Sequence, residues 1–402
     1  EVFAHITGIN LFAQSGTVAD FNVKIGKNGD VQGGSNGVEV RGATDVKGSI
    51  LFQNQGTVAG EQFAVALYRA DTVYVSNSGQ ISSLGNTDYT NALFVSAEYA
   101  SINNSGTIEN FVVDPSDAEY SGAAITAPSA FGKLDGSILD IFNSGSILSE
   151  GEAIDSEQGI DSLTNTGTIN GSIDFDDGGT SAYADHVDNS GDIFGDILLG
   201  NGADEVINSG KLSGNLDFAD ISAGLSGNDS LDNSGDIFGN VLMGSASDTV
   251  KNTGSIMGDI DFGTEGDQSL RNEGTIVGNI FFDAASTVSR NNLAIQNDGI
   301  IDGNILYNGA ATFNLLNEGI LNGSVIQTAS GQGSVFIVNN GSILSLSLGD
   351  NGGEYYGTIG DLVAIAGGAG ADLILTRGPQ KVCLSRFQPI EASWAMLRAT
   401  RS

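Results

Sequence analysis

A five-residue phrase, Asn-x-Gly-x-Ile or Asn-x-Gly-x-Val, recurs along most of the chain and constrains its fold more than any other feature. Clear copies are Asn54–Val58, Asn104–Ile108 and Asn272–Ile276. About fifteen copies are found if two divergent ones, at Gln14 and Lys27, are included, and from Asn165 to Asn339 they follow one another every 19–25 residues. Self-similarity at this period indicates a repeat protein in which each copy packs on its neighbours.

Apolar residues flank each phrase with a period of two, which is typical of β-strands. In the copy at Asn272 they are Leu270, Ile276, Ile280 and Phe282. A unit of about 20 residues cannot bury its own apolar face, but stacked units can. We therefore predict an all-β fold, a parallel β-helix (β-solenoid) of about fifteen coils whose apolar positions form ladders along one core.

The Asn of each phrase has a structural explanation in such a fold. Stacked coils place each side-chain amide next to the same amide one coil away, where the two can form a hydrogen bond. The expected ladder comprises Asn165, Asn189, Asn208, Asn233, Asn252, Asn272, Asn297 and Asn317.

The repeat predicts one long domain and a different C-terminal segment. We expect residues 1–352 to form the β-helix, with irregular N-terminal coils and a loop insertion near 110–140, where the step between phrases lengthens. Residues 353–402 are expected to form a cap or linker. Their end, from Arg377, is basic, and docking on another acidic subunit is the alternative role for this tail.

Composition excludes several classes of function. The chain of 402 residues has 49 acidic and 15 basic residues, a net charge of −34, which opposes binding to nucleic acid or directly to anionic membranes. One Cys and two His exclude a Cys-x-x-Cys zinc site. We expect no required cofactor.

An Asp lies four residues before the Asn in five successive copies, and stacking would align these carboxylates in a column. They are Asp161, Asp185, Asp204, Asp229 and Asp248. Stacked carboxylates repel one another, so the column must be solvated, partly protonated or neutralised by a cation, for which Ca²⁺ is the natural choice. Asp372 is a further candidate ligand, because Gly367–Leu375 resembles one calcium-binding β-roll nonapeptide.

A group of tyrosines and a short acidic cluster are the remaining candidates for contact or catalysis. Tyrosine is favoured at interfaces, and the candidate contact loops contain Tyr68, Tyr74, Tyr89, Tyr99 and Tyr120. Packing of these loops on themselves is the alternative. The acidic cluster Asp174, Asp176 and Asp177 is the nearest approach to the paired carboxylates of a glycosidase, but nothing distinguishes it from other acidic turns. We predict no catalytic residues.

The phrase Asn104-Ser-Gly-Thr-Ile108, with its relatives at Asn165 and Asn272, resembles the passenger repeats of bacterial autotransporters. The resemblance covers roughly residues 10–345 and implies a right-handed parallel β-helix that is exported to the cell surface or beyond. The chain lacks the family's C-terminal barrel, so a released or truncated passenger, or a repeat protein exported by another route, is expected. The implied function is adhesive or structural, with a cell-surface glycan, a protein or another copy as partner. A calcium-stabilised surface-layer, matrix or filament protein is the first alternative, and a carbohydrate-active enzyme is the second.

Overall fold

The protein is described by a computed structural model in which the described residues form strands and turns, without a helix. The described residues are 2–4, 7–14, 20–42, 48–85, 90–110, 122–128, 137–156, 159–175, 182–218, 227–282, 292–307, 312–327, 335–347, 353–357, 364–366, 373–376 and 383–384. They belong to two compact units. Unit 1 comprises Glu1–Val206, Gly210–Gly214 and Ile221–Leu225, and unit 2 comprises Ile207–Ser209, Asn215–Asp220 and Ser226–Ser402.

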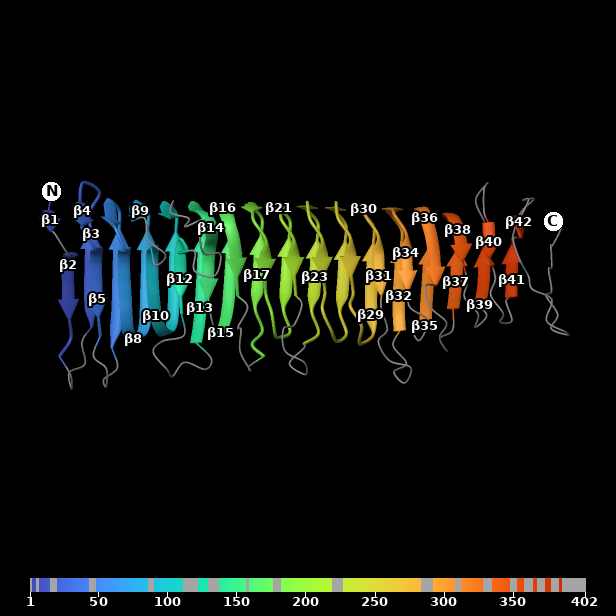
Figure 1. Ribbon diagram of the computed structural model, residues 1–402, viewed down its shortest axis with the longest axis horizontal. Coiled ribbons are helices and arrows are strands. Elements are labelled where there is room, and N and C mark those ends of the chain that lie inside the picture. The colour runs from blue at the N-terminus through green and yellow to red at the C-terminus, as the bar shows by residue number, and fades with distance from the viewer. Residues whose placement is uncertain are drawn as a thin grey trace. The chain divides into compact units, whose positions relative to one another are not determined.

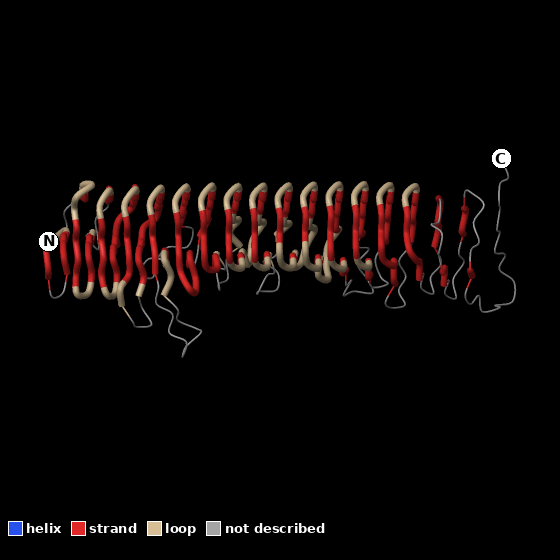
Figure 2. The backbone as a smooth tube through the Cα atoms, turned by 90° about the horizontal axis from the view of Figure 1, so that it is seen from above, coloured by secondary structure: helices blue, strands red, loops and turns tan. Residues whose placement is uncertain are grey.

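Each unit is a parallel β-solenoid with three faces, and each face is a row of strands contributed by successive turns (Figure 1). Face A contains the strands that end at the repeated Asn. Face B contains the strands that follow the Asn-x-Gly turn, and face C contains the strands after the next turn. Short turns join the strands within each unit (Figure 2).

Unit 1 builds its faces from strands of unequal length, because four of the long strands contribute to two faces. Face A holds β3 (Phe21–Ile25), β6 (Ser49–Asn54), β8 (Phe63–Asn77), β10 (Asn91–Asn104), β13 (Ser137–Asn143), β15 (Gly159–Asn165) and β17 (His186–Asn189). Face B holds β1 (Val2–Ala4), β4 (Asp30–Gly33), β7 (Thr57–Gly60), β9 (Gln80–Ser83), β11 (Thr107–Asn110), β14 (Ser146–Ser156), β16 (Thr168–Asp174), β18 (Asp192–Phe194) and β21 (Lys211–Ser213). Face C holds β2 (Thr7–Phe12), β5 (Asn36–Arg41), β12 (Ile125–Ala127) and β19 (Ile197–Leu198), with parts of β8, β10, β14 and β16. Strand β20 (Glu205–Asn208) is divided between the two units.

Unit 2 repeats the same pattern more regularly. Face A holds β23 (Ser230–Asn233), β26 (Thr249–Asn252), β29 (Gln268–Asn272), β32 (Asn292–Asn297), β35 (Thr312–Asn317), β37 (Val335–Asn339), β39 (Gly353–Gly357) and β41 (Leu373–Thr376). Face B holds β24 (Asp236–Ile237), β27 (Ser255–Ile256), β30 (Thr275–Val277), β33 (Ile300–Asp302), β36 (Ile320–Gln327) and β38 (Ser342–Ser347). Face C holds β22 (Leu216–Asp217), β25 (Val241–Leu242), β28 (Ile260–Asp261), β31 (Ile280–Phe282), β34 (Ile305–Tyr307), β40 (Ala364–Ala366) and β42 (Cys383–Leu384), with the ends of β36 and β38.

The predicted apolar ladders form the core of each unit. Equivalent residues of successive repeats pair directly, as Leu270 does with Ile295 and Ile280 with Ile305. All four of these side chains are at most 3% exposed, and so is the large apolar residue at the end of each repeat, for example Phe282. Burying each such side chain contributes about 1.5–3 kcal/mol, so the ladders are the main source of stability.

The Asn side chains are buried at the turns between faces A and B. In unit 1 the Nδ2 atom of Asn143 donates to Oδ1 of Asn165, and Asn165 in turn donates to Asn189, each at 2.8 Å. In unit 2 the same bond joins Asn233 to Asn252 at 2.8 Å. The Asn–Asn pairs described in this way have distances of 2.6–2.9 Å and include 54–77, 77–104, 104–143, 143–165, 165–189, 208–233, 233–252, 252–272, 272–297, 297–317 and 317–339.

The Gly of each phrase is required by the close stacking of these turns. A Cβ atom on Gly254 would lie 2.1 Å from the carbonyl oxygen of Gly235 in the preceding turn, and one on Gly274 would lie equally close to Gly254. Such an approach is far below van der Waals contact, so only Gly fits.

The number of turns is smaller than predicted. The solenoid has about eleven turns, not about fifteen. The prediction assigned one coil to every copy of the phrase, including the divergent copies at Gln14 and Lys27. Residues 15–19, which complete the first of these, lie outside the described part of the chain.

Other sequence predictions fall on residues that are not described. Most of the expected insertion near 110–140 lies in 111–121 and 129–136. The expected boundary at 352/353 adjoins residues 348–352, and the basic tail from Arg377 lies outside the description except for β42.

Candidate binding surface

The Asp column is buried at the start of the face A strands and not exposed to solvent. Asp161, Asp185 and Asp204 in unit 1 are 1–2% exposed, and Asp229 and Asp248 in unit 2 are 2% and 0% exposed. The expectation that these turns are solvated is therefore wrong. The acidic side chains instead lie within the stacked turns.

Each of these carboxylates bonds the backbone of its neighbour. Oδ1 of Asp185 accepts a hydrogen bond from the Asp161 amide at 2.7 Å, and Oδ1 of Asp204 accepts one from the Asp185 amide at 2.8 Å. In unit 2, Asp248 accepts from the Asp229 amide at 3.0 Å. The column thus satisfies buried N–H groups that the strand ladder leaves unpaired.

A neutral residue performs the same task at the end of the column in unit 2. Oε1 of Gln268 accepts from the Asp248 amide at 2.9 Å, while its Nε2 donates to the carbonyl oxygens of Ala246 and Glu265, each at 2.6 Å. The position therefore requires an acceptor and not a negative charge. No group of three or more His, Cys, Asp or Glu residues suited to a metal ion occurs among the described residues, and Asp372 lies outside them.

The expected Tyr loops are in fact strands where they are described. Tyr68 and Tyr74 lie in β8 and Tyr99 lies in β10, whereas Tyr89 and Tyr120 are outside the described residues. Tyr74 is 46% exposed and meets the Tyr99 ring edge-on at 6.0 Å, and the Tyr99 hydroxyl donates to Asp140 at 2.7 Å. That hydrogen bond raises the pKa of Tyr99.

Tyr68 belongs to a compact cluster on face C that sequence analysis missed. The Arg41 guanidinium lies 5.0 Å from the Tyr68 ring centre and 5.5 Å from that of Phe12, and it donates to the nearly buried Glu39 at 2.8 Å. Burial raises the pKa of Tyr68. The cluster neutralises its own charge, and it is best understood as packing of the first turns.

The acidic cluster weighed for catalysis is only partly described. Asp176 and Asp177 lie outside the described residues, and Asp174 is the last residue of β16. Glu152, on the neighbouring strand β14, is half-buried, and burial, reinforced by the charge of Asp174, raises the pKa of Glu152 to about 6. His186 pairs with Glu205 at 3.2 Å (Nδ1–Oε2) on the outside of unit 1. Nothing in these contacts forms a catalytic arrangement.

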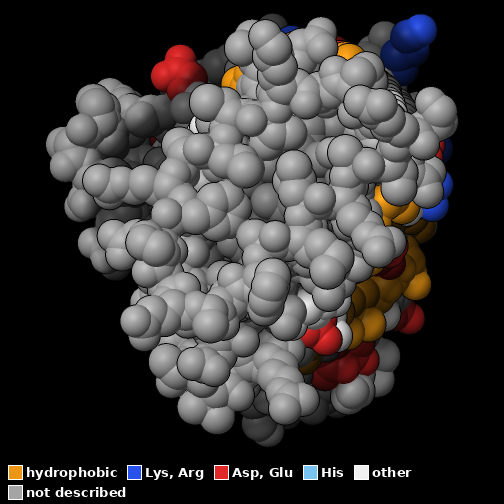
Figure 3. Space-filling view, turned by 90° about the vertical axis from the view of Figure 1, so that its right-hand side faces the viewer, with side chains coloured by type: hydrophobic (Ala, Val, Ile, Leu, Met, Phe, Trp, Pro, Cys, Tyr) orange, Lys and Arg blue, Asp and Glu red, His pale blue; other side chains and the backbone are white. Residues whose placement is uncertain are grey.

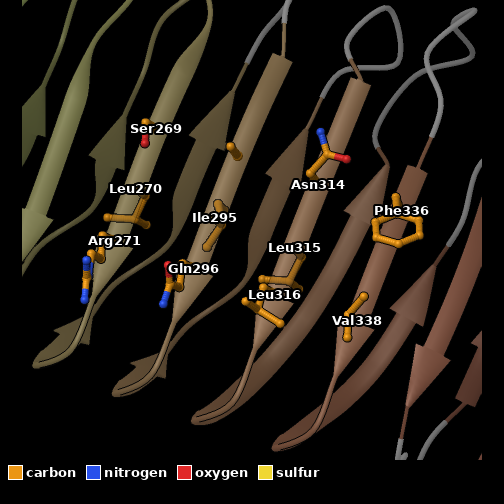
Figure 4. A pocket seen from close by; sticks show the side chains of 11 residues that line it. Ser269, Leu270, Arg271, Ile295, Gln296, Asn314, Leu315, Leu316, Phe336 and Val338 are labelled. Atoms are coloured by element: carbon orange, nitrogen blue, oxygen red, sulfur yellow. The ribbon is translucent and has the colours of Figure 1, made fainter.

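An open groove of about 530 Å³ lies on face A of unit 2 (Figure 4). It crosses strands β29, β32, β35 and β37, and we call it the groove. Its outward side chains form two in-register rows, namely Ser269, Ala294, Asn314 and Phe336, and Arg271, Gln296, Leu316 and Val338. Leu270, Ile295 and Leu315 complete the lining.

The groove arises from the sizes of the side chains in these rows. The lining includes two small side chains, Ser269 and Ala294. Phe336 lies at one end of the groove and Arg271 at the other (Figure 4). Phe336 and Leu316 are 40% and 37% exposed, so the later strands give the groove an apolar wall.

Polar groups lie at the opposite end of the groove. Arg271 pairs with Glu273 at 2.7 Å, and Lys251 in the preceding strand pairs with Asp232 at 2.7 Å. Lys251 and Arg271 are adjacent in register, so two of the chain's 15 basic residues meet here. Sequence analysis missed this surface, although its residues occupy fixed positions one and three residues before each Asn.

The comparisons with known proteins identify no relative of this chain. No protein-family model matches the chain, and no curated protein or solved structure matches it either. Within the described residues, no helix has the length and apolarity needed to cross a membrane.

Proposed function

We propose that this chain is a right-handed β-solenoid, exported and associated with the bacterial cell surface, that acts as an adhesive or structural element. The observation that carries the proposal is the groove, an open and mostly apolar surface built on stacked strands. Surfaces of this kind suit contact with another macromolecule better than enclosure of a small substrate.

Three further points support this assignment. Hydrophobic and acidic side chains lie side by side on the coloured part of the surface visible in Figure 3. The right-handed coil follows the strong preference of parallel strand crossovers for that hand. The phrase that resembles autotransporter passengers occurs at the Asn turns of both units, for example at Asn104 and Asn272.

The proposal is tested by binding and by location. The purified full chain is applied to immobilised collagen, fibronectin and a panel of neutral and sialylated oligosaccharides, and the chain produced in its native cells is sought with antibody on intact cells. We expect antibody labelling at the surface and saturable binding to at least one probe. A chain that stays inside the cells and binds none of the probes would overturn the proposal.

A variant in which a large side chain fills the groove identifies the contact surface. Ala294→Arg places a long side chain on the groove floor without touching the core, since Ala294 points outward. Ser230→Arg adds the same charge on face A, two strands before the groove. Loss of binding in the first variant and not in the second assigns binding to the groove.

A further inference from the structure

The buried Asp column occupies a position that other turns give to apolar residues. Asp161 pairs in register with Leu139 of the preceding turn, which is 4% exposed. In unit 2 the same repeat position holds Gln268, which pairs with the fully buried Leu293 of the following turn. The Asp side chains therefore continue a row of inward-facing core residues.

Burial along the strands agrees with this direction. Val187 and Val250 are fully buried ladder residues, and they lie two residues after Asp185 and Asp248. Side chains two residues apart in an extended chain point to the same side. The Oδ2 atoms of the five Asp residues are buried too. The carboxyl groups thus lie inside the solenoid, next to aliphatic positions of the core.

The cationic side chains of these strands are engaged on the outside. His186, next to Asp185 in the chain, pairs with Glu205 at 3.2 Å. Those of the face A strands around Asp248 form exposed ion pairs of 2.7 Å, namely Lys251–Asp232 and Arg271–Glu273. Asp267, which precedes Gln268, is exposed and acidic. None of these described groups brings a positive charge to the buried side of the strands.

Each carboxyl group faces another carboxyl group one turn away. Asp185 lies between Asp161 and Asp204 in unit 1, and Asp229 lies beside Asp248 in unit 2. Neighbouring strands are about 4.8 Å apart, so two ionised carboxylates at this distance would repel one another strongly away from water. Burial and like charge both favour the protonated form of an Asp side chain.

Gln268 shows which chemical form this position accommodates. Its Oε1 accepts a hydrogen bond from the Asp248 amide, and its Nε2 donates to the carbonyl oxygens of Ala246 and Glu265, each at 2.6 Å. A protonated carboxyl group likewise combines an acceptor oxygen with an O–H donor, whereas a carboxylate has no donor. The neutral acid is therefore the form of Asp that matches Gln268.

We propose that the Asp column is a proton-dependent switch, in which Asp161, Asp185 and Asp204 of unit 1 and Asp229 and Asp248 of unit 2 keep their protons in the folded chain at neutral pH. In an unfolded chain an Asp side chain loses its proton at about pH 4. Above this pH the folded form binds more protons than the unfolded form, so its stability falls as the pH rises. Ionisation places negative charge inside the core and separates the turns at the start of the face A strands.

Infrared spectroscopy of the wild type tests the protonation directly. The C=O stretch of a protonated carboxylic acid is separated from the bands of carboxylates and of backbone amides. We expect this band in the folded full chain at pH 7, and we expect it to disappear after thermal unfolding at the same pH. It should also be weaker in Asp185→Asn.

The variant Asp185→Asn tests the effect on stability, because Asn keeps an acceptor oxygen and needs no proton. Its folding equilibrium in urea should equal that of the wild type at pH 4 and be about a hundredfold more favourable at pH 7. The reason is that a proton held only by the folded form changes this equilibrium tenfold per pH unit. Asp192→Asn is the matched control, since it removes the same charge from an exposed residue of the same turn and should change the equilibrium less than about fivefold at either pH.

The variant Gln268→Glu makes the opposite change by adding a carboxyl group to the row in unit 2. Protonated Glu keeps the acceptor and one donor, so folding should be within about tenfold of the wild type at pH 4. At pH 7 a further loss of about a hundredfold is expected. A loss of packing alone would be the same at both pH values.

Several outcomes would overturn the inference. They are a folded wild type without the protonated-acid band at pH 7, and effects of Asp185→Asn and Gln268→Glu that do not differ between pH 4 and pH 7. Absence of the band together with a melting temperature that rises with Ca²⁺ would mean that a cation neutralises ionised carboxylates instead. Surface location and probe binding are measured separately, so failure of this inference leaves the proposed function standing, and the reverse also holds.

Discussion

Replacement of Asn252 by Ala should destabilise the protein by about 3 kcal/mol. The side chain is fully buried, and its Oδ1 accepts a hydrogen bond of 2.8 Å from Asn233. Its Nδ2 donates to Oδ1 of Asn272 at 2.9 Å and to the carbonyl oxygens of Gly254 and Thr275 at 3.3 and 3.2 Å.

The magnitude follows from these contacts. Two good neutral hydrogen bonds contribute about 1 kcal/mol each, and buried partners that lose a bond add a desolvation cost of about 1–3 kcal/mol. Asn252→Asp should cost more, about 3–5 kcal/mol. It keeps the acceptor for Asn233 but directs a buried carboxylate oxygen at Oδ1 of Asn272.

The measurement is equilibrium unfolding in guanidinium chloride, followed by far-UV circular dichroism. Lys251→Ala is the matched control, because Lys251 precedes Asn252 in the same strand and its exposed ion pair with Asp232 is worth at most about 1 kcal/mol. If Asn252→Ala costs no more than this control, the Asn ladder does not stabilise the turns and the reasoning is refuted.

Three more substitutions test local features. Ala246 has a backbone φ of 95°, where the next repeat has Gly266 at 84°, so Ala246→Gly should raise the free energy of unfolding by about 1 kcal/mol, and a loss would contradict the backbone strain. Asp248→Asn keeps a side-chain oxygen that accepts the hydrogen bond from the Asp229 amide, so at pH 4 the melting temperature should change little. At pH 7 the melting temperatures of wild type and variant should not respond to EDTA or millimolar Ca²⁺. A rise with Ca²⁺ in the wild type alone would identify a metal site. Burial raises the pKa of Glu152 from 4.5 to about 6, so the stability that its protonated form contributes is complete below pH 4.5 and lost as the pH rises through 6. Glu152→Gln should therefore gain about 1 kcal/mol over the wild type at pH 7, after allowance for partial exposure, and nothing at pH 4; an equal effect at both pH values would disprove the shift.

Much of the fold was predictable because the repeat encodes it directly. Alternating positions such as Leu270 and Ile280 point inward in every turn, and parallel stacking then follows from their need for burial. Period and alternation are local signals, and a solenoid has almost only contacts between adjacent turns. The count of turns differed from the prediction, although the divergent phrase at Lys27 does form a turn, since the strands on either side of it, β3 and β4, pair in register with β6 and β7.

The candidate surfaces were harder to predict from the sequence. Burial of Asp248 depends on a backbone amide one turn away, which no residue pattern displays, so the column was expected to be solvated. The groove depends on the relative sizes of Ala294 on β32 and Phe336 on β37, which are separated by β35 in the sheet and by 42 positions in the chain. Once the register is known, both follow from aligning the repeats.

The Asn ladder also has a direction. In each described Asn–Asn bond of the ladder, from Asn54–Asn77 to Asn317–Asn339, the Nδ2 atom donates to the Asn of the following turn. Within each unit the amide dipoles consequently point the same way, and each bond polarises the next. A substitution in the middle of such a row interrupts polarisation on both sides, whereas one at its end interrupts it on one side only. Substitution of an Asn in the middle of a row should therefore weaken more hydrogen bonds than substitution of the last Asn at either end.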